Sequence, residues 1–239
     1  MNITVTPDDK FGSHIAQYVS QQILCKPDSS ICVATGTTMD SIWPEIVRIK
    51  HEVNIDYSKA FFFNVDEYVG VAKDNPAGCY FRIVRDLYEP LALASNQFYV
   101  PGAPADNMEE GVKKFQEVLD RLAGIDLMLL NVGGNGHIAF NEPGTPFESN
   151  LYLAKISQST VEAKKDLFGG VDKVPKYGVT MGIKSIMLAK RILFVAKGMH
   201  KASIMNTIIN GPVTVDVPGS VLQLHPFVDV VMGESATLR

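Results

Sequence analysis

Five short apolar runs are the feature of this sequence that most restricts its fold. They lie at residues 31–34, 61–63, 127–130, 192–195 and 228–231. Four of them contain only apolar residues, and the last is interrupted by Asp229 alone. Runs of this length and composition are typical of parallel strands that are covered on both faces. The sequence therefore predicts a parallel sheet buried between layers of other elements.

Amphipathic helices are expected between these runs. Residues 11–23 and residues 108–122 repeat apolar side chains every three or four positions, which places them on one helical stripe. The alternation of strand and helix predicts an α/β fold of three layers, a doubly wound, mostly parallel, Rossmann-like sheet with helices on both faces. A chain of 239 residues, 46% of them apolar, can form this as one domain, residues 1–239. Residues 145–175 are the least regular part and are expected to form a lid or a helical excursion.

The charge balance and the cysteines exclude several classes of function. Acidic residues outnumber basic ones by 26 to 22, so neither nucleic acid nor an anionic membrane is an expected partner. The three cysteines lack C-x-x-C spacing, which indicates reduced thiols, and the five histidines form no H-x-x-x-H metal pair. No segment resembles a secretory signal or a membrane span. We expect a cytoplasmic protein that binds a small molecule and no metal.

Three loops follow predicted strands, where open α/β sheets bind their ligands. In the first loop, Gly36, Thr37 and Thr38 precede a predicted helix, and their amide and hydroxyl groups are suited to hold a phosphate at its N-terminus. Lys201 follows the run at 192–195, also opens a helix, and can add the positive charge that a phosphate needs. The alternatives are a helix capped by threonine and a solvated lysine.

The second loop presents two adjacent carboxylates, Asp66 and Glu67, directly after the apolar run at 61–63. Only one of the two can face the site. A carboxylate with apolar walls beside it has a raised pKa, which suits it to move protons on and off carbon. Helix capping and a surface ion pair are the alternatives.

The third loop, residues 133–144, combines glycines with a histidine, a glutamate and two asparagines. Glycines such as Gly136 let the backbone approach a ligand closely. Glu142 can hold His137 in one tautomer while the other ring nitrogen exchanges a proton with substrate, although a histidine taken alone is more often structural. Residues 134–139 also fit the loose G-x-G-x-x-A dinucleotide pattern, but a Pro-Gly pair interrupts the helix that such a site requires.

Four motifs, in order along the chain, resemble those of the glucosamine-6-phosphate deaminase (isomerase) family, in particular its short bacterial members. Residues 64–70 are NVDEYVG, similar to the family's F-N-x-D-E-Y-V-G, and residues 136–143 are GHIAFNEP, as in the family. Residues 174–177 (VPKY) and 222–226 (LQLHP) also match. The resemblance spans nearly the whole chain.

The resemblance implies an aldose–ketose isomerase that deaminates a 2-amino-2-deoxyhexose 6-phosphate without a metal or organic cofactor. Asp66 would take the C2 proton of the opened sugar and return one at C1, and His137 would open the pyranose ring by proton exchange at O5. Asn135 and Glu142 would orient His137. The expected substrate- and phosphate-binding residues are Gly36, Thr37, Thr38, Gly136 and Lys201. The expected partners are a small amino sugar phosphate and further copies of the chain in a homo-oligomer.

The chain departs from the family pattern in three places. Asn135 stands where many members have Asp, so it cannot contribute a carboxylate charge to the histidine. Asp166 stands where the family has a phosphate-binding arginine, and Lys164 or Lys165 would have to supply that charge without a bidentate contact. This loss makes galactosamine 6-phosphate, whose isomerases form a close branch, an alternative substrate to glucosamine 6-phosphate, and the sequence does not decide between the two. Residues 149–155 replace a basic region used for allosteric activation, so no such activation is expected.

Two other functions are the alternatives to a deaminase. A 6-phosphogluconolactonase shares the sheet and the glycine–histidine loop, but its loop continues G-H-T-A-S-L-F-P, unlike residues 136–143 here. A non-catalytic sugar-phosphate-binding module would not need Asp66, His137 and Glu142 together. The sequence therefore favours the deaminase.

Overall fold

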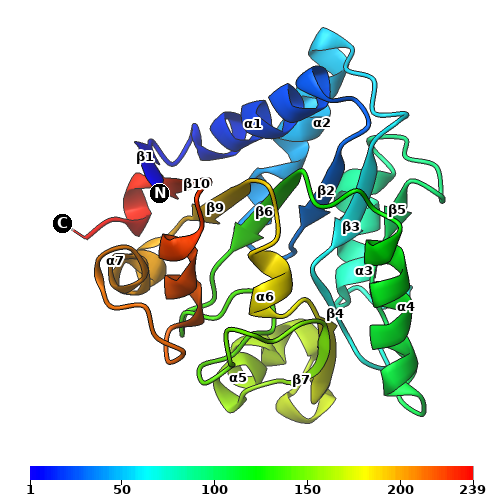
Figure 1. Ribbon diagram of the computed structural model, residues 1–239, viewed down its shortest axis with the longest axis vertical. Helices are drawn as coiled ribbons and strands as arrows, with labels where there is room; N and C mark the ends of the chain where they lie inside the picture. Colours follow the sequence, from blue (N-terminus) through cyan, green and yellow to red (C-terminus); the bar gives the residue numbers. More distant parts are fainter. Residues whose placement is uncertain (239) are drawn as a thin grey trace.

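The computed structural model describes residues 1–238 and contains a seven-stranded sheet in which each neighbouring pair of strands is parallel (Figure 1). The strand order is β1-β10-β9-β6-β2-β3-β5. The strands are β1 (Asn2–Thr6), β2 (Ser30–Val33), β3 (Phe61–Asn64), β5 (Phe98–Tyr99), β6 (Leu127–Asn131), β9 (Ile192–Ala196) and β10 (Val228–Gly233). The predicted α/β fold with a mostly parallel sheet is confirmed.

The five predicted apolar runs are the five inner strands of this sheet. Nearly every residue in them is buried, as expected for strands covered on both faces. The sequence does not predict the two edge strands. β5 has only two residues, and β1 leaves Ile3 and Val5 about half exposed, so neither carries a continuous buried run.

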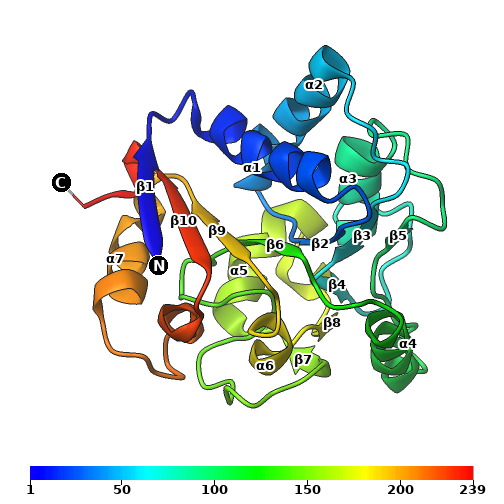
Figure 2. The ribbon, with the colours of Figure 1, turned by 45° about the horizontal axis from the view of Figure 1, so that its top comes forward.

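Helices cover both faces of the sheet (Figure 2). They are α1 (Phe11–Cys25), α2 (Trp43–Val53), α3 (Cys79–Ile83), α4 (Met108–Asp120), α5 (Gln158–Phe168), α6 (Ile183–Ile186) and α7 (Ala202–Asn210). The chain adds β2, β3 and β5 in one direction, and β6, β9 and β10 in the other. Because crossovers between parallel strands are right-handed, this reversal puts α1, α2 and α3 on one face and α4, α6 and α7 on the other. Within residues 1–238, no helix has both the length and the apolar character needed to cross a bilayer.

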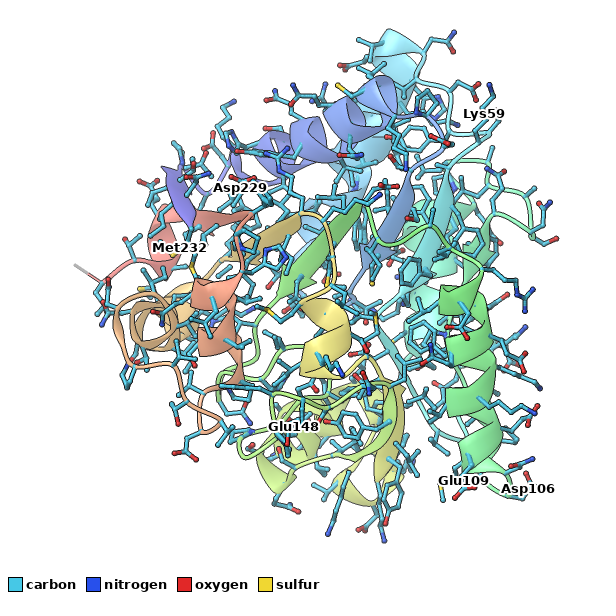
Figure 3. The ribbon with its side chains drawn as sticks, in the orientation of Figure 1. Lys59, Asp106, Glu109, Glu148, Asp229 and Met232 are labelled. Carbon is cyan, nitrogen blue, oxygen red and sulfur yellow. The ribbon has the colours of Figure 1, made fainter. Side chains whose placement is uncertain are left out.

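Helix α4 illustrates how one amphipathic segment satisfies the core and the solvent. Its Phe115 is fully buried and meets the ring of Phe63 edge-on, with ring centroids 6.4 Å apart. Asp106 and Glu109, near its first turn, point outwards (Figure 3). Acidic side chains at that end interact favourably with the helix dipole.

A second, antiparallel sheet lies beyond the carboxyl ends of the parallel strands (Figure 1). Its order is β4-β8-β7, formed by β4 (Asp66–Tyr68), β8 (Tyr177–Thr180) and β7 (Tyr152–Lys155). Residues 145–175 thus contain β7 and α5, and the sequence predicts neither these three short strands nor their pairing. Local interactions fix both ends of α5. At its start the hydroxyl of Ser157 accepts a hydrogen bond from the N–H of Thr160, and at its end Gly169 adopts a left-handed conformation.

A small aromatic cluster fastens α5 above the second sheet. The ring of Tyr68 lies 4.8 Å from that of Phe140 and 5.1 Å from that of Phe168, measured between centroids. Tyr68 comes from β4, Phe140 from the loop after β6 and Phe168 from α5. Aromatic contacts of this kind stabilise packing beyond the area they bury. The cluster therefore packs three segments that are distant in sequence against one another, at the carboxyl end of the main sheet.

Candidate active site

The loops after β2 and β6 flank the point where the direction of strand addition reverses. From β2 the chain continues to β3 on one side, and after β6 it continues towards β9 on the other. Open α/β sheets bind their ligands at such a switch point. The two loops are joined there, because the side-chain amide of Asn131 donates a hydrogen bond of 3.1 Å to the carbonyl of Thr35. The predicted loops therefore meet at one place.

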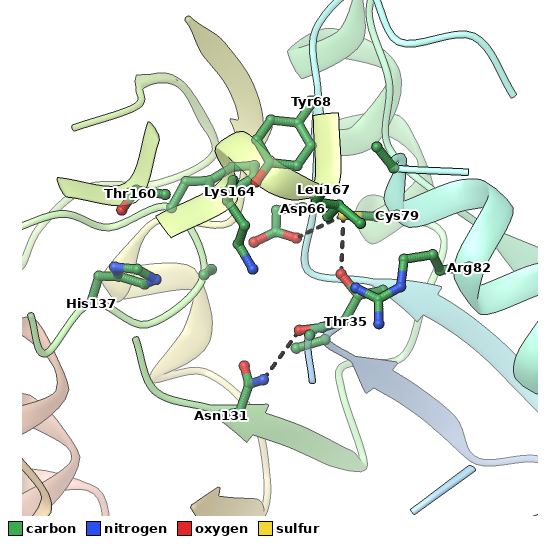
Figure 4. A pocket seen from close by; sticks show the side chains of 15 residues that line it. Thr35, Asp66, Tyr68, Cys79, Arg82, Asn131, His137, Thr160, Lys164 and Leu167 are labelled. Carbon is green, nitrogen blue, oxygen red and sulfur yellow. Dashed lines mark hydrogen bonds between the residues drawn. The ribbon is translucent and has the colours of Figure 1, made fainter. Parts of the chain in front are cut away.

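Two connected hollows occupy this place. The outer cavity, about 570 Å³, lies between residues 35–38, residues 131–137, α5 and the turn at 200–201. The inner recess, about 70 Å³, lies behind it and contains Asp66 (Figure 4). Thr160 and Lys164 line both. The outer cavity has the size of a small-molecule site.

The adjacent carboxylates of β4 have separate environments. Glu67 accepts the backbone N–H groups of Tyr68, Cys79 and Tyr80 at 2.7, 3.0 and 2.6 Å, so it caps the start of α3. Asp66 points the other way and lines the inner recess. Neighbouring residues of a strand face opposite sides, which explains the division. The capping alternative thus describes Glu67, while Asp66 faces the site.

The carboxylate of Asp66 is nearly without partners. It is 7% exposed, and within residues 1–238 its side chain has one hydrogen-bond partner, the thiol of Cys79 at 3.9 Å, which itself accepts the hydroxyl of Thr35 at 3.1 Å. Burial, together with the charge of Glu67, raises the pKa of Asp66 to about 7, although Lys164 and Cys79 oppose the rise. A carboxylate with such a pKa can accept and return a proton near neutral pH.

The loop after β6 carries His137 over a glycine. A Cβ atom at Gly133 would lie 2.1 Å from Cε1 of His137, so only glycine leaves room for the ring. Asn135 accepts the backbone N–H of His137 at 3.1 Å. The Nδ1 atom of His137 lies 3.4 Å from Oε2 of Glu142, within ion-pair range, but it forms no hydrogen bond with any of residues 1–238. The ring is thus placed between the cavity and an acceptor behind it.

Glu142 is the acceptor at the centre of this loop. Thr160 donates to its Oε1 at 2.6 Å and Asn135 donates to its Oε2 at 2.8 Å. Burial opposes its ionisation, but His137 and these two donors prevail and lower the pKa of Glu142 to about 2. Glu142 therefore stays a carboxylate at any pH where the protein would work, and it favours a proton on Nδ1 of His137.

The structure places four of the five residues predicted to bind substrate or phosphate in the lining of the outer cavity. Gly36, Thr37, Thr38 and Lys201 line the outer cavity. Gly136 lines neither hollow: its α-carbon faces Val217 and Ile204, and its N–H is bonded to the carbonyl of Gly133. Its φ of 88° suits a glycine, so it shapes the loop. The helix predicted from residue 39 begins as a 3₁₀ turn, Met39–Ser41, with α2 following.

Lys201 is a buried cation. It is 5% exposed, and its ammonium group donates to the hydroxyl of Thr38 at 2.6 Å. Burial and repulsion from Lys164 lower the pKa of Lys201 to about 8. An ammonium group in this position gains most from an anion in the cavity beside it.

The structure also brings into the site residues that the sequence does not single out. Cys79 and Arg82 of α3 line the inner recess, and Thr160 of α5 lines both hollows (Figure 4). Arg82 forms an ion pair of 2.7 Å with Asp40, across the gap between α3 and the phosphate loop. No local motif marks these positions, because only the packing of α3 and α5 against the switch point brings them there.

Together these features describe an α/β protein whose switch point holds a buried carboxylate and a histidine beside a cavity suited to an anion. The chain belongs to the family of glucosamine-6-phosphate isomerases/6-phosphogluconolactonase, whose model matches residues 8–230. The glucosamine-6-phosphate deaminase of Clostridium botulinum (strain Loch Maree / Type A3) is 36% identical over 237 residues, covering 99% of this chain and 97% of the relative. That of Lachnoclostridium phytofermentans is 35% identical over 229 residues, covering 96% and 97%. The family resemblance inferred from the four motifs is confirmed.

Solved structures agree with this assignment. A monomeric glucosamine-6-phosphate deaminase has a TM-score of 0.95 and 30% identity, and the match covers 99% of this chain and 98% of that chain. The 6-phosphogluconolactonase from Thermotoga maritima has a TM-score of 0.76 at 16% identity, with 98% and 99% covered. The second likeness demonstrates a common fold only.

Proposed function

We propose that this protein is an aldose–ketose isomerase and deaminase that converts a 2-amino-2-deoxyhexose 6-phosphate, glucosamine or galactosamine 6-phosphate, to a ketohexose 6-phosphate and ammonia. The observation that carries the proposal is the poorly partnered carboxylate of Asp66, with its pKa near 7, in the same pair of hollows as His137 and Lys201. The deaminase names of relatives about 36% identical over almost the whole chain support it.

In this proposal His137 opens the sugar ring. Glu142, 3.4 Å from Nδ1, favours a proton on that nitrogen, which leaves Nε2 to exchange a proton with the ring oxygen O5. Asn135 holds the backbone of His137 and the carboxylate of Glu142 at once. Positioning of this kind removes much of the entropic barrier to proton transfer.

Asp66 then moves the proton between carbons. As a carboxylate it takes the proton from C2 of the open chain, and as a carboxylic acid it returns a proton to C1. The resulting C2 imine is hydrolysed by water, which releases ammonia and leaves the ketose. These steps require no electron carrier, so Asp66 and His137 suffice as proton-transfer groups.

The phosphate binds, in this proposal, at the outer cavity. Gly36, Thr37 and Thr38 offer amide and hydroxyl donors there, and Lys201 offers a buried positive charge. The predicted contact by Gly136 is not retained, because that residue lines neither hollow. For Lys201→Ala we expect a raised KM with kcat less affected, since the phosphate is remote from the reacting carbons.

We further infer a cytoplasmic protein of one domain. The three cysteines are free, which suits a reducing compartment. The expected homo-oligomer competes with a monomer, the state named for a solved relative. Light scattering of the purified protein decides between them.

Ammonia release from glucosamine 6-phosphate and galactosamine 6-phosphate, measured side by side, tests the proposed function. Ammonia from either sugar supports a deaminase, and the faster substrate names the preferred configuration at C4. Hydrolysis of 6-phosphogluconolactone serves as the control for the alternative enzyme. No ammonia from either sugar, together with lactone hydrolysis, would replace the deaminase with a lactonase.

A further inference from the structure

The charges of the outer cavity are unbalanced. Over residues 1–238 its lining includes Lys164 and Lys201 but no Asp or Glu. Within the same residues, neither lysine has a carboxylate oxygen within 4.0 Å of its ammonium nitrogen. The two cations repel each other strongly enough to contribute to the lowered pKa of Lys201. An anion between them would replace this repulsion with two attractions.

Helix α5 directs one cation, and only that one, towards the site. Thr160, Lys164 and Leu167 are spaced by four and three residues, so they share a helix face, and all three line the inner recess. The neighbouring Lys165 forms an ion pair with Glu162. Asp166, which stands where the family resemblance places an arginine, is exposed and lines neither hollow. Asp166 therefore lies away from an incoming anion.

The same lysine also faces the carboxylate of the inner recess. The amine of Lys164 points into the recess beside Asp66 (Figure 4). The other ionisable side chains that line this recess are Tyr68 of β4, Cys79 and Arg82 of α3, and His137 of the loop after β6. Glu67, adjacent in β4, faces away from the recess and accepts a hydrogen bond from the backbone N–H of Cys79 at the start of α3. Lys201 lines the outer cavity and not the recess.

We propose that Lys164 serves two anionic groups of the site, as the second cation for the substrate phosphate and as the counter-charge of Asp66. The first role rests on the proposed function for the sugar that carries the phosphate, but phosphate binding can be measured without it. Lysine is a mobile point charge on a flexible stem, which lets one ammonium group reach both partners. The second role links the two hollows, because a change at Lys164 should alter both the affinity for phosphate and the pKa of Asp66.

Titration calorimetry with inorganic phosphate tests the first role. We expect Lys164→Gln to weaken phosphate binding about 10- to 100-fold, the usual range for loss of a charge-assisted contact. Lys165→Gln is the matched control, one position along the same helix, and should bind phosphate within about twofold of the wild type. Equal phosphate affinity in Lys164→Gln and the wild type would overturn the first role. Lys164→Arg, which keeps the charge, should retain most of the affinity and shows that the helix still folds.

The pH dependence of kcat/KM tests the second role. Lys164 opposes the rise in the pKa of Asp66, so its removal should move the acid limb of the profile to higher pH. Lys201→Gln should raise KM and leave that limb in place, because Lys201 lies outside the recess. An acid limb that stays in place in Lys164→Gln would overturn the second role. If the wild type releases no ammonia, the proposed function fails, and the phosphate titration still decides the first role.

Discussion

The two ends of the parallel strands each hold a buried aspartate, and the two aspartates behave in opposite ways. Asp66, at the carboxyl ends, and Asp126, at the amino ends, are both 7% exposed. The pKa of Asp66 is raised to about 7, whereas that of Asp126 is lowered to about 2. Equal exposure of the two residues therefore does not fix the pKa. Burial raises the pKa of Asp66, which has few partners, whereas the partners of Asp126 outweigh its burial.

Those partners differ in number and in charge. Asp126 accepts from the ammonium groups of Lys26 and Lys190 at 2.5 and 2.8 Å and from the N–H of Ser30 at 3.0 Å, which together outweigh its burial. Asp66 has one thiol at 3.9 Å. At the amino ends the charges are satisfied within the protein, so that end contributes stability. At the carboxyl ends Asp66 and Lys164 lack such ion-pair partners among residues 1–238, a pattern that is common at catalytic sites.

Of the substitutions considered, Asp66→Asn should change ammonia release the most. We expect about a 10²- to 10⁴-fold loss of ammonia release, since a proton-transfer group is removed. Because the folded pKa of Asp66 lies above its ordinary value, its ionised form costs stability above about pH 7, and this cost fades as the pH falls towards 4. The variant should therefore be more stable than the wild type at pH 8, by on the order of 1–4 kcal/mol in urea unfolding. Wild-type turnover would remove Asp66 from the mechanism.

Gly133→Ala should displace the ring of His137 without changing any charge. Its new methyl group would overlap the ring of His137, so the ring must move, and a misplaced group can cost roughly 10²-fold in kcat/KM. Gly102→Ala is the control, because nothing lies within 4 Å of the added Cβ and the residue lines neither hollow. Similar kcat/KM values for the two variants would contradict the placement of His137 over residue 133.

Asp126→Ala should affect the opposite end of the strands. We expect a loss of about 1–3 kcal/mol in urea unfolding at neutral pH, moderated because both lysine partners are partly exposed to solvent. The ordinary pKa of an aspartate lies above that of Asp126, so its contribution is present above about pH 4 and is lost as the pH falls towards 2. The difference between variant and wild type should shrink over that range. A kcat equal to that of the wild type would confirm that this end is structural, and a reduced kcat would contradict the division between the two ends.

The last prediction concerns the wild type, whose kcat/KM should pass through a maximum as the pH changes. Ionisation of Asp66 near pH 7 should produce the acid limb of kcat/KM, with about a tenfold fall for each pH unit below it. Loss of the proton from Lys201 near pH 8 should weaken phosphate binding and produce the basic limb. The maximum should thus lie between about pH 7 and pH 8. A flat profile across this range would contradict the assignment of the two limbs to Asp66 and Lys201.

Much of the sheet can be predicted from the sequence because burial on both faces leaves a continuous apolar run. The inner strands carry that signal. β1, with Ile3 and Val5 about half exposed, lacks it, and the short strands of the second sheet have only three or four residues each. Their pairing depends on tertiary packing, so their own composition is a weak guide.

The candidate site divides in a similar way. Asp66, His137 and Lys201 follow strands directly, so the rule that ligands bind at the carboxyl ends of strands is enough to single them out. Arg82 belongs to α3 and Lys164 to α5, and only the packing of these helices shows which face meets the cavity. Gly136 shows the opposite case: the sequence motif singles it out, but in the structure it shapes the loop and lines neither hollow. The catalytic and binding roles themselves stay predictions until the variants are measured.

The parallel pairing of β1 with β10 has a consequence for how the protein assembles. Asn2 and Asp229, joined by a side-chain hydrogen bond of 3.1 Å, are 227 positions apart in the chain. Contacts between such distant segments must pay the entropy of closing a long loop before they contribute stability, and they slow folding. During synthesis β1 therefore cannot pair with β10 until that strand has emerged. The last region to reach its final order should be the edge farthest from β5, and we expect its amides to exchange with solvent before those of β2 and β6.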